Sequence, residues 1–356
     1  MKILIASPVS ANSTRGNRIS AIRWTDMLRE LGHQVVLKEE GEMGGQSVSS
    51  ADHRSETTSV DGQEEGFDEQ EFDCLIALHA RRSAPSVEWF HERFPAGCIV
   101  VCLTGTDLHG DLQPSTDDNQ SQSQMRHQIA VRSLELADRL VLLEPEGLKR
   151  IPQKHRAKCQ VIFQSAEQSD DRGEPPADHF LVSVIGHLRP IKDPFRVAEA
   201  VRSLPETSKI SVIQIGDALS AEMKEQAIRE QADNPRYHWI GSVSHQEALR
   251  VLTQSHLTVL SSFAEGGPSV LSEAIVNHIP VLSSRIDASL GILGSGYQGF
   301  FDAGATQELA RLLIRAESDS GFLGQLRTEV KSRAGFFKRS AEKAAWSQLL
   351  DSLELN

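Results

Sequence analysis

Residues 265–284 read EGGPSVLSEAIVNHIPVLSS, and this stretch combines a turn, a helix start and a second apolar run. It follows the run LTVLSS at residues 257–262, which is typical of a strand buried in a parallel sheet. Gly266 and Gly267 predict a turn, and Pro268 stands near the first helical position, where its missing N–H costs nothing. The order of strand, turn, helix and strand predicts an α/β domain.

The predicted helix start is suited to an anion. The N–H groups of Ser269, Val270 and Leu271 should point out of the helix start, toward a ligand such as a diphosphate. Glu265 precedes the turn and Glu273 lies inside the helix, so a carboxylate stands on either side. Carboxylates accept charge-assisted hydrogen bonds from diols. The stretch therefore favours a nucleotide-sugar site, although two glutamates at this spacing also occur on ordinary helices.

The same alternation continues outward over the whole chain. Apolar runs predict strands near residues 2–8, 34–40, 74–79, 99–105, 139–145 and 159–165, then near 180–187, 209–216, 237–242, 257–262 and 280–284. Two doubly wound, Rossmann-like domains facing across a cleft follow from this pattern. We expect a first domain at residues 1–166, a second at 167–336, and a C-terminal helix at 337–356 that crosses back to the first. Residues 166–178 are expected to be the linker.

Composition excludes several classes of protein. The chain has 356 residues and a formal net charge of −12, which disfavours a nucleic-acid binder. No apolar run approaches the ~20 residues that span a bilayer. The four cysteines, Cys74, Cys98, Cys102 and Cys159, show no zinc spacing and predict a reduced, cytoplasmic protein. The polar segments 41–70 and 110–124 are expected to be surface loops.

Several ordered motifs resemble those of the retaining GT-B glycosyltransferases. Glu265 to Glu273 matches the E-x7-E motif of that group, and IGHLRPIKDP at residues 185–194 resembles its phosphate clamp. The clamp arginine of the group falls on His187 here, while Arg189 follows two residues later and Lys192 keeps its place. The resemblance implies that Arg189 and Lys192 neutralise the leaving diphosphate and that Glu265 is catalytic. No DxD-type metal motif stands out, so we expect departure without a metal and no cofactor.

The resemblance also implies the remaining donor contacts. Base contacts are expected at residues 240–243, and the glycine-containing loop of RGNRIS faces the donor. The full predicted donor set is Gly16, His187, Arg189, Lys192, Gly241, Val243, Glu265, Gly266, Gly267, Pro268, Ser269, Val270, Leu271 and Glu273.

A narrower resemblance rests on RGNR, ALHARRSA, LTGTDL, RSLELADRLVLL, GHLRPIKDPF, NPRYHWIG and EGGPSVLSEA. Together these are similar to the selenosugar synthase family of selenoneine biosynthesis. Membership would imply reaction of selenophosphate with UDP-N-acetylglucosamine or UDP-glucose, which gives a 1-selenosugar, UDP and phosphate. The expected partners are these small molecules, with no nucleic acid and no membrane.

Residues at strand ends of the first domain are consistent with an anionic acceptor. Arginines pair with phosphate oxygens in a bidentate way, and the carboxyl ends of parallel strands share one edge of a sheet. The predicted acceptor set is Arg15, Asn17, Arg18, Arg81, Arg82, Thr104, Gly105 and Thr106. His79 and Asp107 are added as catalytic candidates, but His79 also fits a satisfied histidine and Asp107 a turn cap. Arg81 and Arg82 also fit side chains that face solvent or pair with acidic loops.

Two alternatives stay open beside this reading. A glycosyltransferase with another small acceptor, such as a thiol, alcohol or carboxylate, would share every donor residue. A non-catalytic nucleotide-sugar binder would keep the donor site without turnover. A dinucleotide oxidoreductase is disfavoured, because SPVSANSTRGN follows the first strand in place of GxGxxG.

Overall fold

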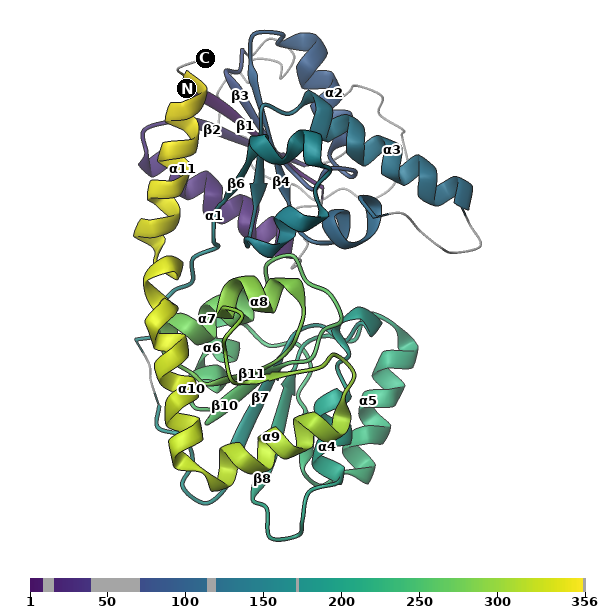
Figure 1. Ribbon diagram of the computed structural model, residues 1–356, viewed down its shortest axis with the longest axis vertical. Coiled ribbons are helices and arrows are strands. Elements are labelled where there is room, and N and C mark those ends of the chain that lie inside the picture. Colours follow the sequence, from purple (N-terminus) through teal and green to yellow (C-terminus); the bar gives the residue numbers. More distant parts are fainter. Residues whose placement is uncertain (9–15, 40–70, 114–119, 171–172, 355–356) are drawn as a thin grey trace, which may run out of the picture. The chain divides into compact units, whose positions relative to one another are not determined.

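A computed structural model describes residues 1–8, 16–39, 71–113, 120–170 and 173–354 (Figure 1). The chain falls into two compact units, each built on a sheet of six strands. The first unit comprises residues 1–141, 157–160 and 350–356, and the second comprises 142–156 and 161–349. Residues 142–156 thus group with the second unit, whereas the sequence placed them in the first domain.

The sheet of the first unit has the order β2-β1-β3-β4-β5-β6. All of the strands expected here are present, and β1 pairs in parallel with both β2 and β3. Their bounds are β1 Lys2–Ser7, β2 Gln34–Glu39, β3 Cys74–Leu78, β4 Cys98–Leu103, β5 Arg139–Leu142 and β6 Cys159–Val161. The helices between them are α1 Gly16–Glu30, α2 Ala84–Arg93 and α3 Gln120–Leu136, with a short η2 at Asp107–Asp111.

The sheet of the second unit has the order β12-β11-β10-β7-β8-β9. Its strands are β7 Phe180–Ile185, β8 Ile210–Ile215, β9 Tyr237–Trp239, β10 Leu257–Leu260, β11 Val281–Ser284 and β12 Phe300–Phe301. The sequence did not predict β12, because two residues are too few for a periodic pattern. The helices are α4 Arg196–Arg202, α5 Ala221–Asp233, α6 His245–Thr253, α7 Ser269–Asn277, α8 Asp287–Leu293, α9 Thr306–Ser318 and α10 Ser320–Arg333.

Hydrophobic burial explains why these segments fold as they do. The strands β1, β3 and β4 are buried almost along their whole length, as expected where helices cover both faces of a parallel sheet. Helix α1 buries Trp24, Met27 and Leu28 on one stripe and ends before Gly32, whose φ of +90° suits glycine.

The C-terminal helix α11 spans Arg339–Glu354 and runs from the second unit into the first. Trp346, Leu349 and Leu350 form its buried side. Within this helix, the boundary between the two units falls at Leu350. The architecture is therefore two Rossmann-like units with a terminal helix shared between them, as predicted.

Two expected loops have different outcomes. Residues 120–124 belong to α3, so the prediction of a loop over 110–124 was wrong there, because the polar Gln and Ser residues form the exposed start of a helix. The segment 41–70 lies wholly outside the described residues.

The cysteines and the helices bear on two further expectations. All four cysteines are free, and burial raises the pKa of the Cys74 and Cys102 thiols well above the usual value. Over the described ranges, the helices are all too short or too polar to cross a membrane.

Candidate functional site in the second unit

The predicted donor residues gather where the topology of the second sheet reverses. The chain leaves β7 toward β8 on one side and leaves the neighbouring β10 toward β11 on the other. In open α/β sheets, ligands bind outside the carboxyl ends of strands at such a switch point. The loops that follow these two strands are residues 186–193 and 261–268, which carry the clamp and the start of the E-x7-E motif.

Three hydrogen bonds join these two loops. The Ser261 hydroxyl donates to the carbonyls of Lys192, at 3.1 Å, and Asp193, at 2.8 Å. The Phe263 N–H donates to the Ile191 carbonyl at 2.8 Å. Asp193 adopts a left-handed φ of +44°, which turns the clamp loop into α4. The fold therefore holds the two loops in a fixed register before any ligand binds.

The centre of the site is an ion pair between the two loops. Lys192 Nζ lies 2.6 Å from Glu265 Oε1, and the Ser262 hydroxyl donates to the same oxygen at 2.7 Å. The Ser284 hydroxyl in β11 in turn donates to the Ser262 carbonyl at 2.6 Å. Lys192 keeps 26% and Glu265 14% of its side-chain exposure. The pair is thus both well anchored and open to a ligand on one side.

The start of α7 differs in one detail from the prediction. Pro268 is the N-cap residue and provides no side-chain cap, so the N–H groups of Ser269 and Val270 have no partner inside the helix. The Leu271 N–H instead donates to the Pro268 carbonyl at 3.0 Å. The expectation that Leu271 offers a third free N–H was therefore wrong in this structure, because the first turn of the helix is tightened.

Gly267 has a packing reason as well as the expected turn role. A Cβ atom at this position would lie 2.8 Å from the Leu143 Cβ, which is too close for any real side chain. Leu143 belongs to the segment that the second unit gains after β5. The sequence alone could not show this contact, because it joins positions that are far apart in the chain.

The second motif carboxylate has a partner that sequence reasoning missed. His245, the first residue of α6, places Nε2 3.0 Å from Glu273 Oε1. Ser244 caps this helix by accepting from the Glu247 N–H at 3.2 Å. The capping pattern S-x-x-E directly after the expected base segment is the signal that could have found it.

The remaining clamp residues lie at the ends of β7, β8 and β9. The His187 Nδ1 accepts from the Asp217 N–H at 3.2 Å, and the guanidinium of Arg189 is exposed. Gly241 has a φ of +73°, and its carbonyl accepts from the Gly216 N–H at 2.8 Å. A Cβ on Gly216 would overlap the carbonyl of residue 186, so the close approach of these strand ends requires glycine. Val243 is half-buried beside them.

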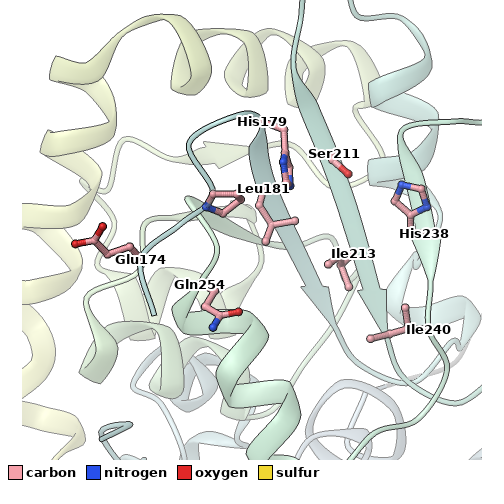
Figure 2. Close-up of a pocket in the computed structure, with 9 residues that line it drawn as sticks. Glu174, His179, Leu181, Ser211, Ile213, His238, Ile240 and Gln254 are labelled. Atoms are coloured by element: carbon pink, nitrogen blue, oxygen red, sulfur yellow. The ribbon is translucent and has the colours of Figure 1, made fainter. Parts of the chain in front are cut away.

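A separate cavity of about 630 Å³ opens on the same sheet. Figure 2 shows side chains from β7, β8 and β9 on neighbouring strands, with Gln254 at the end of α6. Of its described lining residues, Ile240 alone falls in the segment expected to contact the base. The lining comprises Glu174, Pro176, His179, Leu181, Ser211, Ile213, His238, Ile240 and Gln254.

Candidate functional residues in the first unit

Asp107 is wholly buried, and its carboxylate accepts hydrogen bonds from several backbone N–H groups. The N–H groups of Ala80, Thr104, Gly105 and Leu108 donate to it at 3.0, 3.1, 2.8 and 3.0 Å. The carboxylate thereby joins the segment after β3 to the segment after β4. Of the two roles considered for Asp107, the structure supports the cap.

Both ring nitrogens of His79 also have hydrogen-bond partners. Its Nδ1 accepts from the Arg82 N–H at 3.3 Å, and its Nε2 lies 2.8 Å from the Thr106 hydroxyl oxygen. Burial lowers the pKa of His79, although the Asp107 and Asp111 carboxylates act in the opposite direction. A neutral ring with Nδ1 as acceptor carries its proton on Nε2, so it offers no free lone pair to a substrate. His79 therefore behaves here as a satisfied histidine.

The residues of the predicted acceptor set, and Gly16 of the donor set beside them in sequence, have different environments. Arg81 Nε lies 2.9 Å from Asp111 Oδ2, an ion pair that takes up one of the expected anion ligands. Arg82, Arg18, Asn17 and Thr104 are half-buried, Gly105 is buried, and Gly16 and Thr106 are exposed. Arg15 lies outside the described residues. Gly16 begins α1, so the residues of the first loop that the structure describes are helical.

No metal site is apparent in the part of the chain with described coordinates, where no three His, Cys, Asp or Glu side chains gather to hold an ion. Metal-independent departure stays a prediction.

Comparisons with known proteins

Comparisons with known proteins agree with the fold. Residues 165–334, a little under half of the chain, match the family model described as glycosyl transferases group 1. This range contains the clamp, the switch point and the whole E-x7-E motif. The matched range lies within the second unit and agrees with the GT-B resemblance seen in the motifs there.

Two curated relatives align with this chain at low sequence identity. Glycosyltransferase 1 domain-containing protein 1 of Xenopus tropicalis is 21% identical over 374 aligned positions, which cover 100% of this chain and 99% of the relative. TuaC of Bacillus subtilis, named as a teichuronic acid biosynthesis glycosyltransferase, is 26% identical over 144 residues. That match covers 40% of this chain and 34% of the relative.

Solved structures share the fold over nearly the full length. HepE of Anabaena, in complex with UDP, superposes with a TM-score of 0.72 at 16% identity, covering 99% of this chain and 100% of that one. Sucrose-phosphate synthase of Thermosynechococcus elongatus gives a TM-score of 0.76 at 16% identity, covering 99% of both chains. The fold is that of the GT-B glycosyltransferases.

Proposed function

We propose that the protein is a glycosyltransferase that takes its sugar from a UDP-sugar and forms a carbon–selenium bond. Selenophosphate, a UDP-sugar (UDP-N-acetylglucosamine or UDP-glucose) and water give a 1-selenosugar, UDP and phosphate. The observation that carries the donor half is the Lys192–Glu265–Ser262 cluster at the switch point of the second sheet. The motif resemblance over both units carries the selenium half.

Donor chemistry follows from the charges of this cluster. Losing UDP moves an electron pair from the anomeric carbon–oxygen bond onto the diphosphate, so negative charge grows there. The Lys192 ammonium and the free N–H groups of Ser269 and Val270 can offset that charge. Glu265, held by the Ser262 hydroxyl, can accept hydrogen bonds from the sugar hydroxyls. HepE in complex with UDP provides a precedent for this nucleotide on the same fold.

The acceptor chemistry needs little help from a base. Selenophosphate is anionic near neutral pH, so its selenium attacks the anomeric carbon as the UDP bond breaks. Water then attacks phosphorus and breaks the selenium–phosphorus bond, which leaves the electron pair on selenium and releases phosphate. The proposal agrees with the occupied state of His79 and Asp107, since neither needs to accept a proton from the nucleophile.

A second candidate is glycosyl transfer to another small acceptor, such as a thiol, alcohol or carboxylate. One observation favours it: the Arg81 guanidinium is paired with Asp111 and is not available to a phosphate in this conformation. Fewer available cations in the first unit suit an acceptor with less charge than selenophosphate.

The test is an anaerobic assay of the whole chain with UDP-N-acetylglucosamine or UDP-glucose, with and without selenophosphate. UDP release is followed by chromatography and the sugar product by mass. We expect selenophosphate-dependent UDP release and a selenium-bearing sugar. UDP release that is equal with a thiol, alcohol or carboxylate acceptor would favour the second candidate. Donor binding without any product would overturn both and leave a nucleotide-sugar binder.

A further inference from the structure

His245 is placed to control the second carboxylate of the donor motif. Its Nε2 lies 3.0 Å from Glu273 Oε1, and no other described residue bonds the Glu273 carboxylate. Glu273 keeps 15% of its side-chain exposure, whereas His245 is 68% exposed. One carboxylate oxygen is therefore fixed from the outside of the protein, and Oε2 is left to accept from a ligand.

The charges around His245 favour its protonated form. The hydrogen bond to Glu273 raises the pKa of His245 against the opposing effect of burial, and the Glu167 carboxylate raises it further. On its own helix, the Glu247 carboxylate is paired with Arg250 at 2.6 Å. His245 thus faces Glu273 from α7 and Glu167 from the preceding segment, and an imidazolium is the species that these groups stabilise.

The backbone of Glu273 is anchored independently of His245. The Asn277 side-chain amide donates to the Glu273 carbonyl at 2.8 Å, and its oxygen accepts from the Ser169 N–H at 2.9 Å. These bonds fix the helix, so the freedom left at this position lies in the Glu273 side chain. His245 is the group that removes that freedom.

We propose that His245 is a positioning residue that holds the Glu273 carboxylate ready for the ribose diol of the nucleotide donor. This inference rests on the proposed function, in which α7 binds a nucleoside diphosphate. A fixed carboxylate loses less conformational entropy when it accepts the two hydroxyls. The contribution is specific to the ribose, because the phosphates and the base are bound by other residues of the site.

The proposal predicts a dependence on pH and on the 2′-hydroxyl. As the pH rises above 6.5, the ordinary value from which the pKa of His245 is raised, the ring loses its charge and the charge-assisted bond to Glu273 weakens. UDP affinity should fall over this range, whereas the affinity for 2′-deoxy-UDP, which lacks one of the two hydroxyls, should change much less.

Calorimetric titration of the whole chain with UDP and with 2′-deoxy-UDP tests the proposal. We expect His245→Ala to weaken UDP binding roughly 5- to 10-fold, to leave 2′-deoxy-UDP binding within about twofold, and to remove the pH slope. His245→Gln keeps a donor without the charge, so it should restore much of the affinity but not the slope. His91→Ala, at an exposed histidine of α2 in the first unit, is the matched control and should behave as the wild type.

The outcomes separate the inference from the function beneath it. A wild type that binds UDP, with an unchanged ribose preference and pH slope in His245→Ala, would overturn the role of His245 alone. A wild type that binds neither nucleotide would overturn the proposed donor site, and the inference with it.

Discussion

The polar clusters of the two units contain similar residues but use their charge differently. In the first unit, the Asp107 carboxylate is fully buried and accepts from four backbone N–H groups, while Arg81 is paired with Asp111. In the second unit, Glu265 and Lys192 pair at a partly open surface, and the start of α7 beside them has no side-chain cap. The first cluster is used to shape loops, whereas the second keeps charge that a ligand can reach.

The comparison shows that a charged residue at a strand end is not by itself evidence of a site. Both clusters follow parallel strands at the edge where ligands bind in this class of fold. Asp107 accepts from four backbone N–H groups, whereas the partners that the structure describes for Glu265 include the Lys192 ammonium and the Ser262 hydroxyl. A carboxylate that accepts four N–H groups has little capacity left for a substrate.

The largest expected effect is the loss of turnover when Lys192 is replaced. Lys192→Met keeps the length of the side chain but removes the charge that offsets the leaving diphosphate. We expect UDP release to fall by about a hundred- to a thousand-fold, as when one group that stabilises a developing anion is removed. The rate is measured with saturating UDP-sugar and acceptor.

Lys224→Met is the control for this variant, because Lys224 is an exposed lysine of α5 in the same unit. It should leave the rate unchanged. Equal rates for Lys192→Met and the wild type would break the comparison, since the open cluster would then be no more functional than the closed one.

Much of the fold was predictable because parallel strands and amphipathic helices leave local patterns. The runs at residues 2–8 and 180–187 proved to contain β1 and β7, and α1 buries one apolar stripe. The glycine turn and α7 were predictable for the same reason, since turn and cap chemistry is local. The exception, β12, is too short to leave a pattern.

The occupancy of the polar groups could not be predicted, because it depends on contacts between distant positions. The Ala80 N–H reaches Asp107 from another strand end, and His245 reaches Glu273 from another helix. Residue types and spacing identify Asp107 and Glu265 equally well as carboxylates after a strand. Only the three-dimensional structure shows which of them is already saturated.

The Asp107→Asn variant tests whether the cluster of the first unit serves stability. The amide keeps one acceptor oxygen and turns an NH₂ group toward backbone donors, so buried N–H groups lose their partners. We expect the free energy of unfolding, measured by urea titration, to fall by about 3 kcal/mol. UDP affinity should stay within about twofold, because the Lys192–Glu265–Ser262 cluster lies in the other unit.

Asp26→Asn, at an exposed position of α1, is the control and should leave stability unchanged. If Asp107→Asn kept its stability but lost turnover, Asp107 would be catalytic, and the contrast between the two units would fail.

The smallest expected effect concerns Glu144, a buried carboxyl of the second unit that lacks the donors Asp107 has. Its Oε2 accepts from the Glu146 N–H at 2.6 Å, but its Oε1 is buried without a hydrogen-bond partner among the described residues. Burial raises the pKa of Glu144 from 4.5 to about 7, and the carboxylates of Asp287 and Glu146 add to the rise. The protonated form therefore predominates in the folded protein over a range where the unfolded chain is ionised.

The sign of the resulting pH dependence follows from proton uptake. Between about pH 4.5 and about pH 7 the folded state binds more protons at Glu144 than the unfolded state, so its contribution to stability falls as the pH rises. Above about pH 7 the cost is fully present. Glu144→Gln is neutral at every pH, so at about pH 8 it should be more stable than the wild type by about 2 kcal/mol, and at about pH 4.5 the difference should vanish.

Urea titrations at both pH values, with Glu206→Gln at an exposed position as the control, measure this difference. A gain that is the same at both pH values would show that Glu144 does not titrate in this range. A loss at about pH 8 would show that the Glu144 carboxylate is stabilised when charged, as that of Asp107 is by its four N–H donors. In that case the number of backbone donors would no longer distinguish a saturated carboxylate from an unsatisfied one.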